Sequence, residues 1–162
     1  YNLLIANIQN AEKVTREPAY SSRAASHGAM DVGSTYAEVD LSNQKAYFIK
    51  DGQVVLSSDV VTGNPNRGNA TPQGTYTLTY KTRNAVLRGE KRPDGTYSYE
   101  SPVAYWMPFN GGIGFHDASW QSSFGGSRYK SHGSHGCINM PTQKAKEMYN
   151  LISDGTPVIC HY

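Results

Sequence analysis

The amino-acid sequence predicts a mainly β domain, and three observations lead to that prediction. From Thr35 onward, apolar and polar side chains alternate over several short segments, as in a strand with one buried face. Asp-Gly pairs at positions 51–52 and 94–95 are typical of tight turns between antiparallel strands. The composition, with 16 Gly, 12 Tyr and only 17% charged residues, also favours strands and loops over a helical bundle.

The same alternation assigns the strands in chain order. Segments 35–41 and 45–50 alternate, and the turn at positions 51–52 leads into segment 53–63, which predicts a β-hairpin. Segment 71–82 alternates again, with Tyr and Leu on one face and Thr on the other. A turn at positions 94–95 and a closing strand at 156–162 complete the β pattern.

One segment has the period of a helix. Apolar residues recur at helical spacing in segment 141–153, where Pro141 fits a first helical position and Gly155 is placed to end the helix. Residues 1–34 have no regular period and are predicted to be a linker or the remnant of an upstream domain. Residues 35–162 are therefore expected to form one domain.

Length, charge and composition exclude several classes of protein. A chain of 162 residues suits one main domain, and its net charge of +2, with scattered Lys and Arg, predicts no nucleic-acid partner. The sequence has no run of 18 apolar residues and no signal-peptide pattern, and it starts without Met, as a fragment or processed product does. Two cysteines do not make a disulfide framework, so both thiols are expected to be free. The Gly-rich segment 63–74 lacks the lysine of a phosphate loop and is expected to be a surface loop.

The two cysteines have different surroundings. Cys160 lies among apolar residues in PVICHY and is expected to be a packed strand residue. Cys137 lies instead in KSHGSHGCINM, among glycines, serines and histidines. A cysteine reacts as its thiolate, which requires a nearby imidazole or dipole to stabilise the charge or accept the proton. Cys137 is therefore the candidate nucleophile.

A candidate base and a candidate oxyanion hole accompany this cysteine. His116 follows the short apolar segment 113–115, so a strand would hold its ring and direct it toward a loop. Gly133 and Gly136 would let the backbone bend, so that amides, including that of Cys137, could bind an oxyanion.

These residues resemble a known family signature. His116, seventeen further residues and then the SHGCIN motif at positions 134–139 are similar to the signature of the L,D-transpeptidase (YkuD-like) catalytic domain. The similarity includes DVVTGNP, ATPQGTYTL and HDASW, and it covers positions 35–162. The resemblance implies a β-sandwich with one helix after the catalytic cysteine loop, and it identifies positions 35–162 as the catalytic domain.

The resemblance also implies roles for individual residues. Cys137 would be the nucleophile, His116 the base and His135 a second imidazole, while three neighbours would shape the site: Ser134, Gly136 and Asn139. A lid is implied too, and segment 101–112 is expected to provide it, with aromatic and apolar side chains that cover a peptide: Tyr105, Trp106 and Met107. Trp120 is expected in the pocket wall. Asp117 is expected either to orient an imidazole or to cap a turn.

The activity that the resemblance implies is acyl transfer on peptidoglycan. Cys137 would cleave the bond between the third residue and the terminal D-alanine of a tetrapeptide stem, form a thioester, and pass the acyl group to a side-chain amine of a second stem. The product would be a 3→3 cross-link. The expected partners are the donor and acceptor stems and carbapenem inhibitors, with no cofactor and no metal. We expect a monomer outside the cytoplasm, at the cell wall or cell surface, that acts in cell-wall biogenesis, cell shape and β-lactam resistance.

Two other classes of function stay open from the sequence. An L,D-carboxypeptidase would use water in place of the amine. An ordinary cysteine peptidase is disfavoured because His116 precedes Cys137, and a sortase because it would require a more distant His and a following catalytic Arg. A non-catalytic zinc site would use four side chains of suitable chemistry: His116, His132, His135 and Cys137. His132 could equally be a solvated loop residue.

Overall fold

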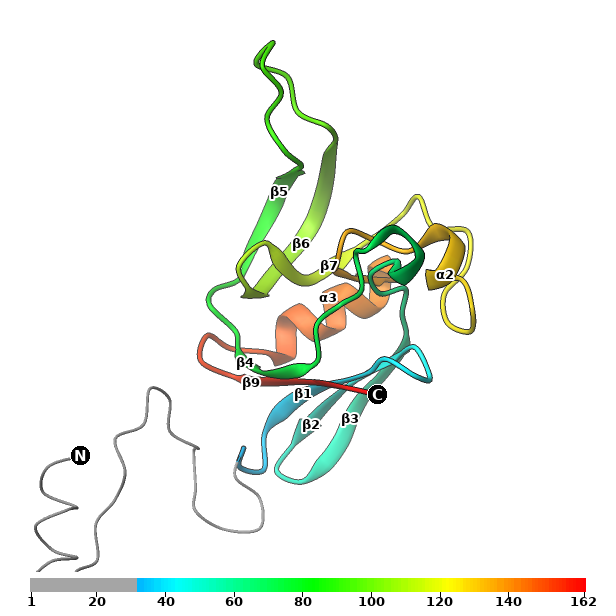
Figure 1. Ribbon diagram of the computed structural model, residues 1–162. Helices are drawn as coiled ribbons and strands as arrows, with labels where there is room; N and C mark the ends of the chain where they lie inside the picture. The colour runs from blue at the N-terminus through cyan, green and yellow to red at the C-terminus, as the bar shows by residue number, and fades with distance from the viewer. Residues whose placement is uncertain (1–31) are drawn as a thin grey trace, which may run out of the picture. The chain divides into compact units, whose positions relative to one another are not determined.

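The computed structural model describes residues 32–162, and the predicted linker of residues 1–34 lies almost wholly outside this part. Within the described part, nine strands form two sheets (Figure 1). The first sheet has the order β3-β2-β1-β9-β4, with these bounds: β1 Tyr36–Asp40, β2 Lys45–Lys50, β3 Gln53–Asp59, β4 Gly74–Thr77 and β9 Pro157–His161. The second has the order β5-β6-β7-β8: β5 Thr82–Arg88, β6 Glu100–Asn110, β7 Ile113–Asp117 and β8 Ile138–Met140. The mainly β prediction is confirmed.

The predicted hairpin is the β2–β3 pair. Asp51 and Gly52, which connect these strands, have φ angles of 51° and 78°. Two consecutive positive φ angles match the right-handed twist of a two-residue hairpin, and Asp-Gly tolerates them. The β1–β2 turn is fixed differently, because the Asp40 carboxylate accepts hydrogen bonds from the Asn43 backbone and side-chain N–H groups at 2.8 and 2.7 Å.

One hydrophobic core lies between the sheets and the helix α3, Thr142–Leu151. Ala145 and Met148 of α3 are fully buried, and α3 packs against β6 and β7. The helix predicted at 141–153 is therefore present, although Pro141 precedes its first turn and Gly155 lies in the turn beyond it. Cys160 is buried in β9 as expected, and both cysteines are free.

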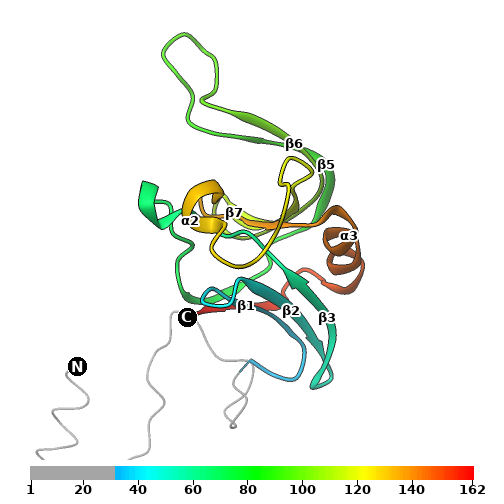
Figure 2. The same ribbon diagram turned by 90° about the vertical axis from the view of Figure 1, so that its right-hand side faces the viewer.

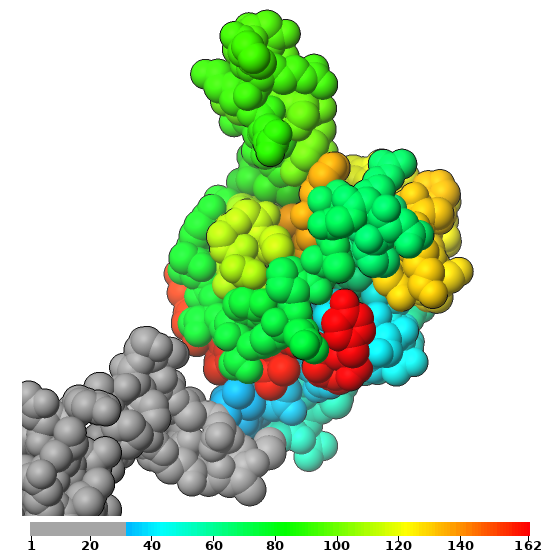
Figure 3. Space-filling model, in the orientation of Figure 1, coloured from blue at the N-terminus to red at the C-terminus, as the bar shows by residue number. Residues whose placement is uncertain are grey.

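Two short helices were not predicted, because three or four residues carry no readable period. They are the 3-10 helix η1, Pro65–Arg67, and the single-turn helix α2, Tyr129–His132. Figure 3 shows the segment around η1 lying against the segment around α2, in agreement with their contacts. Among residues 32–162, no helix is long and apolar enough to cross a bilayer.

Strands β5 and β6 extend beyond the rest of the domain as a long arm (Figures 1 and 2). Their pairing runs from Thr82 opposite Trp106 to Arg88 opposite Glu100, and the Asp94-Gly95 turn closes the far end. The near half of β6 lies between β5 and β7, so it is a central strand of the second sheet. This arrangement decides which side chains of β6 face the core.

Candidate active site

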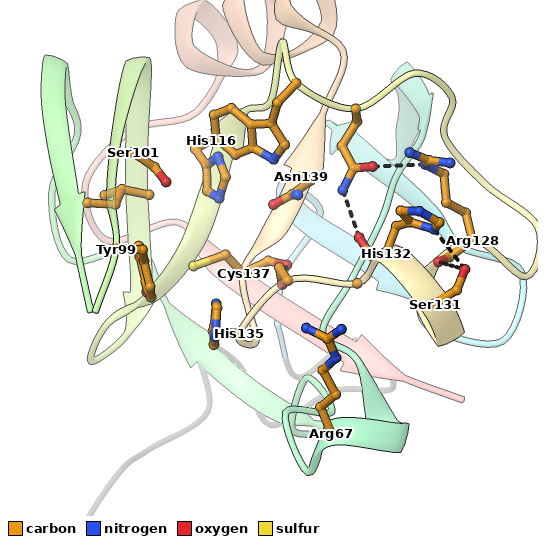
Figure 4. Close-up of a pocket in the computed structure, with 15 residues that line it drawn as sticks. Arg67, Tyr99, Ser101, His116, Arg128, Ser131, His132, His135, Cys137 and Asn139 are labelled. Carbon is orange, nitrogen blue, oxygen red and sulfur yellow. Dashed lines mark hydrogen bonds between the residues drawn. The ribbon is translucent and has the colours of Figure 1, made fainter. Parts of the chain in front are cut away.

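Strand pairing brings the two principal candidates together. Strands β7 and β8 run parallel, with His116 opposite Asn139, and Cys137 is the residue immediately before β8. Residues 116 and 137 are 21 positions apart in the sequence, but the register that pairs Phe115 with Ile138 places Cys137 level with Gly114, two residues before His116 on the neighbouring strand. The nucleophile and base candidates therefore border one cavity, as Figure 4 shows.

The Ser134 hydroxyl closes the loop that carries Cys137. Ser134 Oγ donates to the Cys137 carbonyl at 2.6 Å and accepts from the Gly136 amide at 3.0 Å. Gly136 has a φ of +121°, which L side chains rarely adopt. The Gly136 amide donates to Ser134 in this structure, so Gly136 shapes the cysteine loop through its backbone conformation.

The Gly-rich segment 63–74 supports the same loop from outside. The Thr71 hydroxyl accepts from the Gly63 amide at 2.9 Å and donates to the Gly136 carbonyl at 2.7 Å. A Cβ atom on Gly63 would overlap the Asn69 carbonyl oxygen and lie 2.9 Å from Gly136 Cα. The segment was expected to be only a surface loop, but it positions the cysteine loop and requires glycine at position 63.

His116 is buried, with 3% of its surface exposed, and its ring is held by the main chain. Nδ1 lies 2.8 Å from the Asp117 carbonyl oxygen, which can only accept, so Nδ1 carries the proton and Nε2 has the lone pair in the neutral ring. Burial lowers the pKa of His116, while the Asp117 carbonyl and carboxylate oppose that shift. The ring is therefore neutral at pH 7 and can accept a proton through Nε2.

The Asp117 carboxylate does not contact this imidazole through a hydrogen bond. Its Oδ1 accepts from the Tyr105 amide at 2.8 Å and so joins β7 to β6. The main-chain carbonyl of Asp117, and not its side chain, orients the imidazole. The side chain satisfies the buried Tyr105 amide. Asp117 thus supports the site through its main chain.

Cys137 is partly buried, and its thiol is protonated at neutral pH. Burial raises the pKa of Cys137 to about 11, although a hydrogen bond from the Gly114 backbone lowers it in part. The Sγ–H group donates to the Gly112 carbonyl at 3.3 Å. The resting pair is therefore a neutral thiol and a neutral imidazole, and the proton leaves Sγ when the thiol attacks.

His135 lines the same cavity, and its ring contacts the arm. Its exposed ring stacks on Tyr99, with ring centroids 4.7 Å apart and an interplanar angle of 18°. Tyr99 comes from the β5–β6 arm, and burial raises its pKa, with a smaller contribution from Cys137. His135 therefore links the cysteine loop to the arm, a contact that the sequence did not indicate.

The cavity around Cys137 has a volume of about 400 Å³. Figure 4 shows Tyr99, His116 and His135 near Cys137 at one side, and Arg67 and Arg128 at the other. Its lining also includes Asn139, which is 2% exposed and whose Oδ1 has no hydrogen-bond partner among the described residues. A concave site with a thiol, a neutral imidazole and an unsatisfied amide oxygen is suited to acyl transfer on a peptide.

Comparison with known proteins identifies the family. A family model for the L,D-transpeptidase catalytic domain, YkuD, matches residues 34–160.

The chain belongs to the L,D-transpeptidase catalytic domain family.

Solved L,D-transpeptidase structures agree with this assignment. The crystal structure of a cysteine-to-serine mutant of the Enterococcus faecium L,D-transpeptidase is 38% identical, with a TM-score of 0.77, over 99% of this chain and 62% of that chain. The NMR structure of the E. faecium catalytic domain is 46% identical, with a TM-score of 0.69, and the match covers 78% of this chain and 96% of that chain. An L,D-transpeptidase from Mycobacterium smegmatis is 26% identical, with a TM-score of 0.66, and the match covers 80% of this chain and 59% of that chain. No curated protein matches. The chain thus spans about three fifths of the first E. faecium structure.

The three side chains predicted to form a lid do not cover the cavity of this L,D-transpeptidase domain. Tyr105 and Met107 belong to the hydrophobic core, and Trp106 is 6% exposed, with its ring 6.0 Å from that of His116. None of the three lines the cavity, because β6 is a central strand whose two faces are both covered. The arm contributes Leu87, Tyr99 and Ser101 to the cavity instead.

Trp120 lies where the sequence placed it, in the cavity wall. Its side chain is 50% exposed, and its ring lies 5.8 Å from that of His116. His132 also lines the cavity but is exposed and bonded to the Ser131 hydroxyl at 2.9 Å. Within residues 32–162, no three His, Cys, Asp or Glu side chains are grouped as a metal site requires, so the zinc alternative has no geometric support.

Proposed function

We propose that this domain catalyses acyl transfer between peptidoglycan stem peptides through a thioester on Cys137. One observation carries the proposal: a thiol and a neutral imidazole, whose Nε2 is left free by the Asp117 carbonyl, border the same cavity. The similarity to L,D-transpeptidases supports the same reaction class.

In the first half-reaction, Cys137 Sγ attacks the carbonyl carbon of the third residue of a tetrapeptide stem, and the thiol proton passes to His116 Nε2. The carbon–nitrogen bond to the terminal D-alanine then breaks, and the same proton goes to the departing amine. Free D-alanine and a Cys137 thioester result. The Asn139 Oδ1 atom, which is buried without a partner, would accept an N–H group of the bound peptide.

In the second half-reaction, the side-chain amine of the third residue of another stem attacks the thioester carbonyl. His116 Nε2 takes a proton from that amine, the carbon–sulfur bond breaks, and the proton returns to Cys137 Sγ. The product is a 3→3 cross-link. Water in place of the amine gives a tripeptide, which is the carboxypeptidase outcome.

Inhibitors are expected to acylate the same thiol. A relative from E. faecium, 46% identical to this chain, was solved acylated by ertapenem. A second relative, 39% identical, was solved as a carbamoyl enzyme with avibactam. We extend carbapenem acylation to Cys137 on the basis of that identity. Because peptidoglycan lies outside the cytoplasmic membrane, we also place the protein there, at the cell wall or cell surface, where it would contribute to cell shape and to β-lactam resistance.

Mass spectrometry tests the proposal directly. A tetrapeptide donor should leave an adduct on the wild-type protein equal to the donor minus D-alanine, and an added acceptor stem should yield a dimer linked between third residues. Cys137→Ala should give neither species, whereas Cys160→Ser, which changes the buried cysteine of β9, should give both. A Cys137→Ala protein that still formed the adduct would refute the nucleophile, and a tripeptide as sole product would favour the carboxypeptidase.

A further inference from the structure

We propose that Arg67 and Arg128 form a carboxylate-binding subsite for the donor peptide, an inference that rests on the proposed function. Both side chains line the cavity that contains Cys137. Figure 4 shows them on the opposite side of the cavity from Tyr99 and the thiol, so a peptide bound at Cys137 and extending across the cavity would reach them.

Arg128 is held in place before any ligand binds. Its Nε donates to Gln121 Oε1 at 2.8 Å, and Gln121 Nε2 donates to the His132 carbonyl at 2.8 Å. This chain of bonds uses the Nε edge of the partly buried guanidinium and leaves its two terminal nitrogens for another partner. A guanidinium fixed in this way suits a carboxylate, which it can bind through two parallel hydrogen bonds.

Arg67 comes from a different element that is joined to the first. It is the last residue of η1, and Asn66 Nδ2 donates to the Lys130 carbonyl of α2 at 2.9 Å. This bond fixes η1 against the helix that Arg128 immediately precedes. The backbone segments that carry the two arginines are therefore held together, although the Arg67 side chain is exposed and contributes less than Arg128.

No acidic side chain among residues 32–162 neutralises the charge of this pair. No Asp or Glu lines the cavity, and neither arginine forms a salt bridge within the part of the chain that the structure describes. Other surface cations form salt bridges: Arg88 with Glu100 at 2.8 Å, and Lys45 with Asp59 at 2.6 Å. An uncompensated positive potential in a concave site attracts an anionic group of the substrate.

The chemistry of a stem peptide offers two such groups. A tetrapeptide donor ends in the carboxylate of D-alanine, and a stem can also carry a free carboxylate on an internal residue. Both present the same planar anion to a guanidinium, so the subsite is defined by carboxylate recognition. Amidation of each group in turn distinguishes the two sources.

Binding to a protein that lacks the nucleophile tests the subsite without turnover. The full chain with Cys137→Ala is titrated calorimetrically with three tetrapeptides: both carboxylates free, only the C-terminal one amidated, and only the internal one amidated. We expect one amidation to weaken binding roughly tenfold or more, as the loss of a charge-assisted hydrogen bond does. Adding Arg128→Gln should weaken binding of the free acid by a similar factor and abolish the effect of that amidation.

Three further variants sharpen the result. Arg67→Gln should weaken binding of the free acid by about two- to fivefold, since exposed ion pairs contribute little. Arg128→Lys, which keeps the charge but not the fork, should give an intermediate affinity. Arg92→Gln, in the exposed turn of the arm and outside the cavity, is the matched control and should change nothing.

The subsite is refuted by equal binding of the three peptides, by an amidation effect that persists in both arginine variants, or by no measurable binding of the free acid. These outcomes are separate from failure of the proposed function, which would show as a wild-type protein that forms no thioester with a donor. A protein can bind the carboxylate and lack transferase activity, or it can transfer the acyl group without recognising the carboxylate.

Discussion

The carbonyl oxygen of Asp117 lies 2.8 Å from Nδ1 of His116, the residue before it in β7. The imidazole is therefore oriented by its own strand, and no carboxylate is needed to select the tautomer. Because backbone geometry in a paired strand is rigid, Nε2 keeps its direction toward the cavity. This arrangement, together with the loop that carries Cys137, can be tested in four ways.

Replacing His116 by alanine should lower the rate constant of carbapenem acylation by roughly 10²-fold or more, because a positioned general base is lost. His135→Ala should lower the rate constant less, since the His135 ring stacks on Tyr99 and is carried by a loop, whereas His116 is held within a strand. Stopped-flow acylation of both folded variants at one pH measures the two effects. An inactive His135 variant beside a nearly normal His116 variant would move the base to His135.

Asp117→Asn should leave acylation within a few-fold of the wild-type rate, because the main-chain carbonyl stays and the amide oxygen can still accept from Tyr105. The pKa of His116 should fall further, since the charge that raises it is removed, and NMR titration of the ring measures that shift. Asp117→Ala leaves the Tyr105 amide without its acceptor and should cost about 1–3 kcal/mol of unfolding free energy. A large loss of activity in Asp117→Asn at normal stability would show that the carboxylate itself serves the base.

The resting state of the thiol can be read from its pH dependence. Thiolate is the reactive form, so with a pKa of about 11 the alkylation rate of Cys137 by iodoacetamide should rise about tenfold per pH unit from pH 7 to 10. The measurement uses a Cys160→Ser background, so that only one thiol is counted. A rate already constant between pH 6 and 8 would indicate a preformed thiolate–imidazolium pair and contradict the neutral pair.

Gly63→Ala should destabilise the domain by about 1–3 kcal/mol or more, as overpacking does, because the added methyl overlaps the Asn69 carbonyl oxygen. The change should also lower acylation, since Gly63 and Thr71 support the Gly136 carbonyl. Gly112→Ala is the matched stability control, because its methyl meets nothing within 4 Å. Chemical denaturation compares the stability of the two variants. Equal denaturation midpoints would show that segment 63–74 accommodates the added methyl group without loss of unfolding free energy.

Much of the fold follows from local sequence. The Asp51-Gly52 turn forms because these residues tolerate two positive φ angles, and α3 forms where apolar residues recur at helical spacing. Cys160 is buried among the apolar neighbours that predicted it. Such features depend on residues close in the chain, so the printed sequence contains them.

Segment 101–112 shows where local sequence is insufficient. Its aromatic and apolar residues predict a lid, but Tyr105 and Met107 are core residues of a central strand. Pro108 is accommodated where the β6–β7 register shifts, so it does not end the strand. A continuous apolar run looks the same in a covering loop and in a strand buried on both faces.

The sequence by itself determined which residues are candidates for the chemistry, because the side-chain types of Cys137 and His116 and the spacing between them can be read from it directly. Only the tertiary structure decided what surrounds them. The contact of Tyr99 with His135, the support from Gly63 and Thr71, and the hydrogen bond from Asn66 to Lys130 each join segments far apart in the chain. Such contacts depend on how strands pair and sheets pack, and no period or turn signal within one segment encodes them.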